Sequence, residues 1–156
     1  MLSDPKHQDS LDRLANQLRL AAELTPGLIS NIIADACTRL PVLKKAGKTA
    51  RLDRLIEADA WSDAALALID LELPVWRVRR LIYDDGEWFC SLSKQLNLPV
   101  TLDDAADARH EVLPLAILSA FVEARRATRT AHETSSPTVP QVRPISGNPV
   151  CCDNFA

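Results

Sequence analysis

The amino-acid sequence predicts a mainly helical α+β protein, a small helical bundle with one inserted two-stranded β-hairpin. Apolar residues recur every three or four positions over most of the chain, prolines and small polar residues separate these segments, and one segment alternates around Asp85-Gly86. With 156 residues, 47% of them hydrophobic, the chain can bury a core. We expect residues 1–47 to form an N-terminal helical pair, residues 48–130 to form the core, and residues 131–156 to be a disordered tail.

Two amphipathic helices are expected in the N-terminal part. Ser10 is a candidate cap for the first helix, whose leucines follow at three-and-four spacing and which should end near Leu24. Thr25-Pro26 supplies a cap and a proline at the first helical position of the second helix. One wide apolar stripe then continues to Leu40, and Gly47 ends this part of the chain as a helix-terminating glycine.

A pair of shorter helices should follow as a helical hairpin. The third helix is expected to begin at Thr49, and Ser62-Asp63 are expected to cap a fourth helix that runs to about Glu72, before Leu73-Pro74 stops it. The fourth helix is apolar on nearly every side, which is typical of a helix that has neighbours on several sides. We therefore place it at the centre of the molecule.

The segment around Asp85-Gly86 predicts a β-hairpin, because a type I′ turn needs a positive φ at both central residues. With these two residues as the loop, the expected cross-strand pairs are Asp84–Glu87, Tyr83–Trp88, Ile82–Phe89, Leu81–Cys90, Arg80–Ser91 and Arg79–Leu92. Strand alternation then places four candidate partner-binding residues on one face: Arg77, Arg79, Tyr83 and Trp88. A two-stranded ribbon is marginal in water, so one face should pack on helices.

After the hairpin, Thr101 is expected to cap a short acidic turn that contains Asp103, Asp104 and Asp107. Pro114 should open or kink a strongly apolar helix over residues 115–122, which ends in Arg125, Arg126 and Arg129. The remaining residues carry four of the ten prolines and many small polar residues, as disordered segments do.

Composition argues against several classes of function. The formal net charge of −3 gives the whole protein no attraction for a phosphate backbone. The four cysteines form no CxxC pair and lie far from the three histidines, and the four glycines form no phosphate-binding cluster, so we expect no metal and no cofactor. No apolar run approaches the length of a membrane span, and the first residues lack the pattern of a secretory signal, so we expect a cytoplasmic protein without a membrane partner.

Three function hypotheses remain. The leading one is a non-enzymatic protein-interaction or regulatory protein, which binds a protein partner or forms a homo-oligomer. Its binding surface would be the exposed face of the hairpin, the third and fourth helices, or the apolar last helix. The second is a nucleic-acid-associated factor that uses the arginines and aromatic residues of the hairpin, although the acidic tip would repel phosphate. The third is an enzyme built around Cys90 and His110.

Overall fold

The computed structural model describes residues 5–99 and 104–134, and its fold is mainly helical α+β, as the sequence predicts. The elements follow in the order α1 (Pro5–Leu20), α2 (Pro26–Ala36), α3 (Leu40–Lys45), α4 (Ala50–Glu57), α5 (Trp61–Glu72), β1 (Arg77–Asp84), β2 (Glu87–Ser93), β3 (Ala105–His110) and α6 (Leu113–Thr134). None of the helices in this part of the chain is both long and apolar enough to cross a bilayer.

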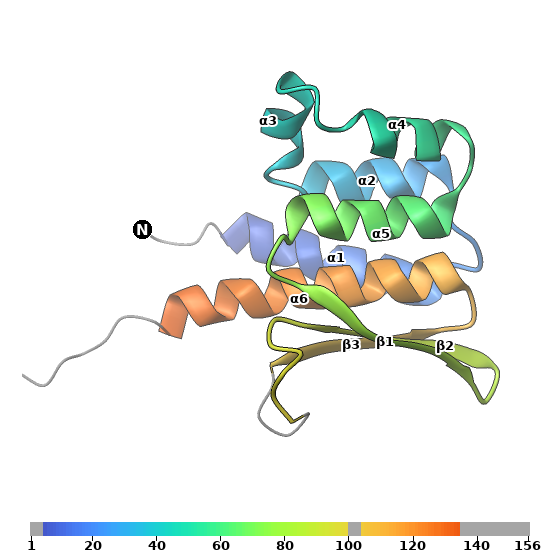
Figure 1. Ribbon diagram of the computed structural model, residues 1–156, viewed down its shortest axis with the longest axis vertical. Coiled ribbons are helices and arrows are strands. Elements are labelled where there is room, and N and C mark those ends of the chain that lie inside the picture. Colours follow the sequence, from blue (N-terminus) through green and yellow to red (C-terminus); the bar gives the residue numbers. More distant parts are fainter. Residues whose placement is uncertain (1–4, 100–103, 135–156) are drawn as a thin grey trace, which may run out of the picture.

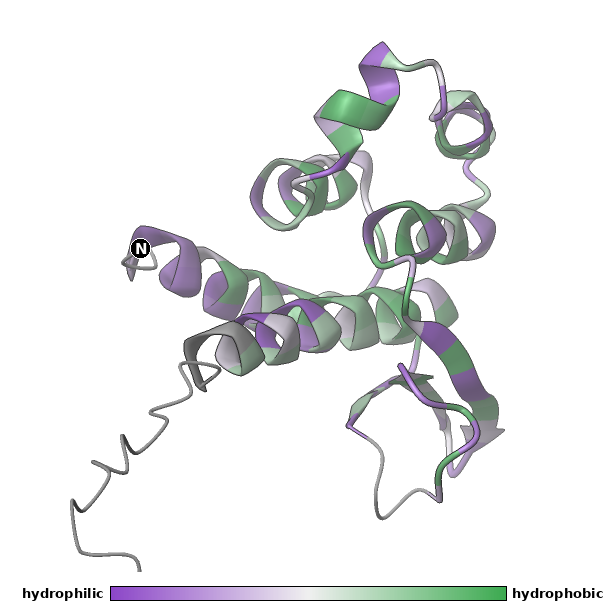
Figure 2. Ribbon diagram, turned by 60° about the vertical axis from the view of Figure 1, so that its left-hand side comes forward, coloured by the Kyte–Doolittle hydropathy of each residue, from purple (hydrophilic) through white to green (hydrophobic). Residues whose placement is uncertain are grey.

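The elements stack in layers from the sheet upward (Figure 1). Helices α1 and α6 lie side by side above the sheet, α2 and α5 cover them, and α3 and α4 form the far end. Figures 1 and 2 together show that α2 and α5 run across α1 and α6. One continuous core joins these layers, with Leu14 from α1, Leu68 from α5, and Leu115 and Phe121 from α6 all fully buried.

Helix α1 begins earlier and ends earlier than the sequence indicated. It starts at Pro5 and ends at Leu20, so Ser10 lies inside the helix and the prediction of a cap at this position is wrong. The Ser10 hydroxyl is buried and donates a hydrogen bond to the backbone carbonyl of His7, 2.8 Å away. A serine that bonds back to the preceding turn in this way is satisfied within a helix.

Helix α2 begins as predicted but is shorter. The side chain of Thr25 accepts a hydrogen bond from the backbone N–H of Leu28 at 3.2 Å, and Pro26 occupies the first turn. The helix ends at Ala36, and α3 starts separately at Leu40, so the prediction of a single apolar stripe to Leu40 as one helix is wrong.

Glu72 explains this interruption. Its side chain is 2% exposed, and its carboxylate accepts hydrogen bonds from the backbone N–H groups of Thr38 and Arg39, at 3.1 and 3.2 Å, and of Leu40 at 2.5 Å. These N–H groups would be unsatisfied where one helix stops and the next begins. A carboxylate from α5 therefore stabilises the break between α2 and α3.

Helices α4 and α5 form the predicted helical hairpin. Thr49 occupies the N-cap position of α4, as expected, whereas α5 starts at Trp61 with Ala60 at its N-cap position. Ser62-Asp63 therefore lie in the first turn of α5 rather than before it. Helix α5 ends at Glu72 as predicted and contacts α3, α4 and α6, which agrees with its apolar character on several sides.

The sheet has three antiparallel strands in the order β1-β2-β3, rather than the two strands predicted. Strand β3 includes Asp107, which was expected in an acidic turn; Thr101 and Asp103 lie outside the described residues. Ala106 and Ala108 of β3 lie opposite Leu92 and Cys90 of β2 on the helix-facing side of the sheet. Small residues at these positions allow α6 to pack closely against β3, a contact that local sequence preference does not show.

Helix α6, and not α5 as predicted, is the central helix of the molecule. Pro114 lies in its first turn, as predicted, but the helix continues past Arg129 to Thr134 and so includes the first residues of the expected tail, whose remaining residues lie outside the described part of the chain. It contacts β2 and β3 on one side and α1 and α5 on the others. Its buried positions between residues 115 and 124 are consequently almost all apolar.

Candidate functional site

The β1–β2 hairpin has the turn that the sequence predicts. Asp85 and Gly86 have φ angles of 52° and 83°, so both occupy the left-handed region that a type I′ turn requires. The predicted pairs hold from Asp84–Glu87 at the turn as far as Arg80–Ser91.

Beyond Arg80 the register differs from the prediction because of a β-bulge. Val78, not Arg79, lies opposite Leu92, and the register shifts between Val78 and Arg80. Arg77 then lies opposite Ser93, on the sheet face away from α6, whereas Tyr83 and Trp88 lie on the helix-facing side. The structure therefore does not bring the four candidate residues onto one face, since Arg79 is the extra residue of the bulge.

The two arginines of this candidate set are held by backbone carbonyls. Arg77 donates from one Nη to the carbonyls of Pro74 and Trp76, at 2.8 and 3.1 Å, and Arg79 donates to the carbonyl of Leu98 at 3.0 Å. These contacts fix the start of β1 and tie it to the segment that follows β2. They also occupy part of the hydrogen-bonding capacity that either guanidinium could offer to a ligand.

Tyr83 and Trp88 form the aromatic cross-strand pair that the sequence predicts. Their ring centroids are 5.2 Å apart with an interplanar angle of 56°, a tilted arrangement that aromatic pairs favour. Trp88 packs against the core, while Tyr83 remains 61% exposed near the end of β1. The pair therefore joins the core to an accessible aromatic surface.

Strand β1 forms an open edge of the sheet, a feature that the sequence alone did not show. Among the described elements its contacts are almost entirely with β2. Ile82 is 43% exposed, and the side chains of Arg80 and Asp84 are exposed and make no hydrogen bond or ion pair with any described residue. The edge thus combines accessible apolar side chains with two unpaired charges of opposite sign.

The backbone of β1 also offers hydrogen-bonding groups at this edge. Residues that flank a two-residue turn exchange backbone hydrogen bonds, so the backbone groups of Asp84, Ile82 and Arg80 point toward β2. Those of Tyr83 and Leu81 consequently point away from β2, toward the open edge. Unpaired groups of this kind are the template on which another strand can add.

The sheet face away from α6 carries mixed charge. The Arg109 guanidinium lies 4.9 Å from the centre of the Phe89 ring, a cation–π contact between paired residues of β2 and β3. Asp107 lies on the same face opposite Ser91, and three acidic residues surround the hairpin tip: Asp84, Asp85 and Glu87. A phosphate backbone would meet these carboxylates wherever it reached the aromatic residues.

Cys90 and His110 lie on the helix-facing side of the sheet, but neither is prepared for nucleophilic catalysis. Burial, together with the nearby carboxylate of Asp107, raises the pKa of Cys90 to about 12, so the thiol is protonated at neutral pH. The Nδ1 atom of His110 accepts a hydrogen bond from the backbone N–H of Val112 at 2.9 Å. Cys37 is also buried, and burial, together with the carboxylate of Glu72, raises the pKa of its thiol well above the ordinary value.

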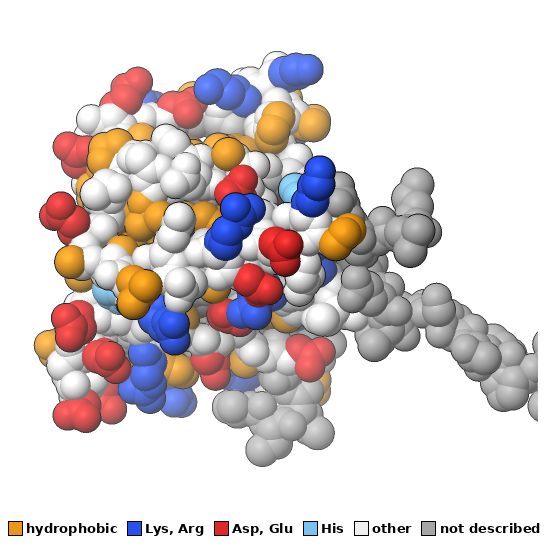
Figure 3. Space-filling model, turned by 180° about the vertical axis from the view of Figure 1, so that it is seen from behind, with side chains coloured by type: hydrophobic (Ala, Val, Ile, Leu, Met, Phe, Trp, Pro, Cys, Tyr) orange, Lys and Arg blue, Asp and Glu red, His pale blue; other side chains and the backbone are white. Residues whose placement is uncertain are grey.

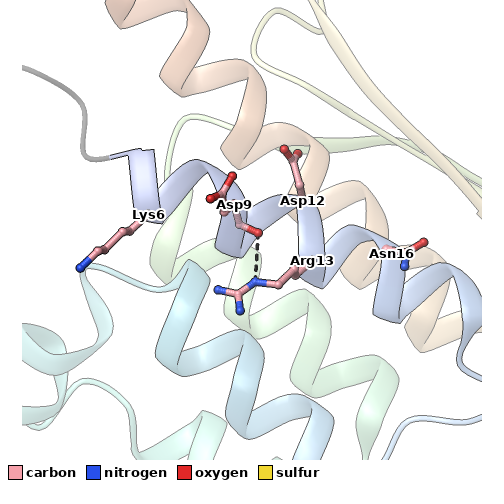
Figure 4. A pocket seen from close by; sticks show the side chains of 5 residues that line it. All are labelled: Lys6, Asp9, Asp12, Arg13 and Asn16. Atoms are coloured by element: carbon pink, nitrogen blue, oxygen red, sulfur yellow. Dashed lines mark hydrogen bonds between the residues drawn. The ribbon is translucent and has the colours of Figure 1, made fainter.

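A groove along α1 is lined by charged side chains that already have neighbours (Figure 4). Arg13 donates from Nε to the backbone carbonyl of Asp9 at 3.2 Å, and Asp12 forms an ion pair of 2.8 Å with Arg126 of α6. The ion pair joins α1 to α6, whereas the Arg13 contact lies within α1. Two of the charged side chains that line the groove, Asp12 and Arg13, therefore make structural contacts.

A second hollow lies where α1 passes into α2. Its lining side chains are small or polar apart from Leu20 and Leu28, and Leu20 is 73% exposed. The view from behind shows hydrophobic side chains on the half of the molecule that carries α1 and α2 (Figure 3). This surface offers apolar area but lacks the open backbone groups of the β1 edge.

Metal ligands do not gather in groups of three or more within the part of the chain that the structure describes. No protein-family model, no curated protein and no solved structure matches the chain. The geometry of the hairpin is therefore the basis on which a function can be argued.

Proposed function

We propose that this is a cytoplasmic, non-enzymatic protein-interaction or regulatory protein, which binds a protein partner through the open edge of β1. The observation that carries the proposal is the combination of unpaired backbone groups with exposed apolar side chains over residues 80–84. Addition of a strand to an open sheet edge is a common way to recognise a peptide or protein segment. Ile82 and Tyr83 would supply the apolar contacts that make such a complex specific.

Nucleic-acid binding has less support from the same surface. The bulge separates Arg77 from Tyr83 and Trp88, and the acidic residues of the tip lie beside the aromatic pair. A single-stranded nucleic acid needs stacking side chains that are bordered by free cations. The β1 edge instead offers one arginine and one aspartate on the same face, at opposite ends of residues 80–84, which suits a strand that carries both charges.

The test is co-purification of the tagged protein from its native cells, with Ile82→Lys compared with the unchanged sequence. A lysine at the centre of an edge strand discourages the addition of another strand. Val42→Lys is the matched control, because Val42 is 69% exposed on α3, far from the sheet. We expect a stoichiometric protein companion that survives Val42→Lys and is lost with Ile82→Lys. A companion that is retained by Ile82→Lys, or nucleic acid in the purified peak, would contradict the proposal.

A further inference from the structure

The part of β1 that can accept a new strand is short and has defined ends. The bulge at Arg79 interrupts the regular ladder on one side, and the turn at Asp85-Gly86 ends it on the other. Residues 80–84 remain between them as a regular strand with an open edge. Helix α6 packs on β2 and β3, so its bulk lies away from this edge.

We propose that the occupant of this edge is β1 of a second copy of the chain. The two strands pair antiparallel about Ile82, and they join two three-stranded sheets into one six-stranded sheet. This inference rests on the proposed function, since it names the partner for the same edge.

Symmetry restricts the registers in which two β1 strands can pair. Two antiparallel edge strands are related by a two-fold axis perpendicular to the sheet, which keeps the helices of both copies on the same side. Residues directly opposite each other must then come from the same face of β1, so the register is centred on a residue and not between two residues.

Charge selects one register among these. A register centred on Arg80 places this arginine opposite its own copy, where like charges repel. A register centred on Leu81 places Arg80 opposite Ile82 and pairs no charges. The register centred on Ile82 places Arg80 of each copy opposite Asp84 of the other, which forms two ion pairs and uses every residue of the available segment.

The remaining pairs of this register are also favourable. Ile82 lies opposite Ile82 on the face away from α6, and Leu81 lies opposite Tyr83 of the other copy on the helix-facing side. Leu81 and Tyr83 are the residues whose backbone groups point toward the open edge, so each of these two pairs exchanges two hydrogen bonds. The pairing would also cover Tyr83, which is 61% exposed in the single chain.

Two complementary charge reversals test this arrangement. In Arg80→Glu, a carboxylate at position 80 meets Asp84 of the other copy, and in Asp84→Lys, an ammonium at position 84 meets Arg80. Each variant alone therefore has two repulsive pairs in its own dimer. In a mixed dimer of one Arg80→Glu chain and one Asp84→Lys chain, all of these pairs have opposite charges.

The experiment measures molar mass by light scattering after size exclusion, over a range of concentrations, for the unchanged protein, each variant and their equimolar mixture. We expect the unchanged protein to approach twice the chain mass of 17.2 kDa, each variant alone to dimerise with a dissociation constant roughly tenfold higher or more, and the mixture to recover dimers. Because only folded chains can recover the dimer, the mixture also controls for misfolding of either variant.

A protein that stays monomeric at every concentration would overturn the self-pairing, and so would variants that dimerise as well as the unchanged chain. If the unchanged chain is monomeric but Ile82→Lys still removes a different protein companion from cells, the proposed function stands and only the second copy is wrong. If Ile82→Lys removes neither a companion nor a dimer, both proposals fail.

Discussion

At the scale of single residues, Glu72 is the polar side chain that most shapes the fold. Its buried carboxylate accepts three backbone hydrogen bonds from the junction between α2 and α3. Hydrogen bonds to a charged acceptor are stronger than those between neutral groups, and loss of the acceptor leaves three donors unsatisfied. The free energy of unfolding therefore depends strongly on this side chain.

We expect Glu72→Ala to lower the free energy of unfolding by about 2–4 kcal/mol. Glu72→Gln should fall between this variant and the unchanged protein, because its amide keeps one accepting oxygen but turns an NH₂ group toward the remaining donors. Urea unfolding measures both changes. Glu23→Ala, at an exposed glutamate, is the control and should change stability by less than about 0.5 kcal/mol. An equally small effect of Glu72→Ala would show that this carboxylate does not stabilise the junction.

Cys90 makes stability depend on alkaline pH. The pKa of its thiol is about 12 in the folded protein and 9.0 in the ordinary case, so the unfolded chain releases this proton first as the pH rises. The buried neutral thiol contributes fully to the free energy of unfolding below pH 9. This contribution is lost between pH 9 and pH 12, by about 1.4 kcal/mol for each pH unit. In Cys90→Ala the free energy of unfolding should fall less steeply over this range. Identical slopes in the two proteins would contradict the burial of a neutral thiol.

At the scale of elements, the turn between β1 and β2 tests the hairpin directly. Asp85 and Gly86 both have positive φ angles, which alanine adopts only at a cost. The replacement of both residues by alanine should lower the free energy of unfolding by about 1–3 kcal/mol. Thermal unfolding measures the loss, and an unchanged melting temperature would remove the type I′ assignment.

At the end of α4, a single substitution should raise the free energy of unfolding. Asp59 follows this helix with a φ of 54°, and the N–H groups of Asp59 and Ala60 bond back to the carbonyls of Ile56 and Leu55. This is the helix-ending geometry in which glycine is preferred. Asp59→Gly should therefore raise the free energy of unfolding by about 0.5–1 kcal/mol, whereas Gly47→Ala, at the equivalent position after α3 with a φ of 70°, should lower it. A loss of stability in Asp59→Gly would contradict the assignment.

The elements also show where sequence reasoning succeeds and where it stops. Several signals that act within a few residues predicted the structure correctly, as at Thr25-Pro26, Pro114 and Asp85-Gly86, whereas the caps expected at Ser10 and Ser62-Asp63 were wrong. The break between α2 and α3 was missed because its stabilising group, Glu72, lies more than thirty positions away in the chain. Strand β3 was missed because alanine and aspartate have low strand preference, and its formation depends on β2 and α6 beside it.

In the candidate site, too, local features could be predicted from the sequence and features that depend on the assembled sheet could not. The Tyr83–Trp88 pair follows from the turn and was predicted, whereas the bulge at Arg79 moves Arg77 to the other face and has no signal in the residues around it. Strand order then places β1 at an edge of the sheet, and only the assembled sheet determines strand order. Arg77 and Arg79, which the sequence pattern placed in the candidate site, donate hydrogen bonds to backbone carbonyls, so the proposed binding surface is the edge of β1.

At the scale of the whole molecule, the helices form the core of the protein, and the edge of the sheet remains accessible. The layers from α1 to α6 bury one core and hold β2 and β3 from above, which leaves β1 supported on one side by β2 and open on the other. Because residues 80–84 already form a strand in the single chain, little conformational ordering is needed before they pair with another strand. Binding at β1 would then extend the sheet without a change in the fold.

Hydrogen exchange of the backbone amides of Leu81, Ile82 and Tyr83, followed by NMR, tests the open edge of β1 most directly. In dilute protein the amides of Leu81 and Tyr83 should exchange rapidly while that of Ile82, which is bonded to β2, is protected. At high protein concentration, or with the bound partner, Leu81 and Tyr83 should become protected as well. If these two amides are already protected in the dilute monomer, or stay unprotected in the complex, the edge of β1 is not the binding surface.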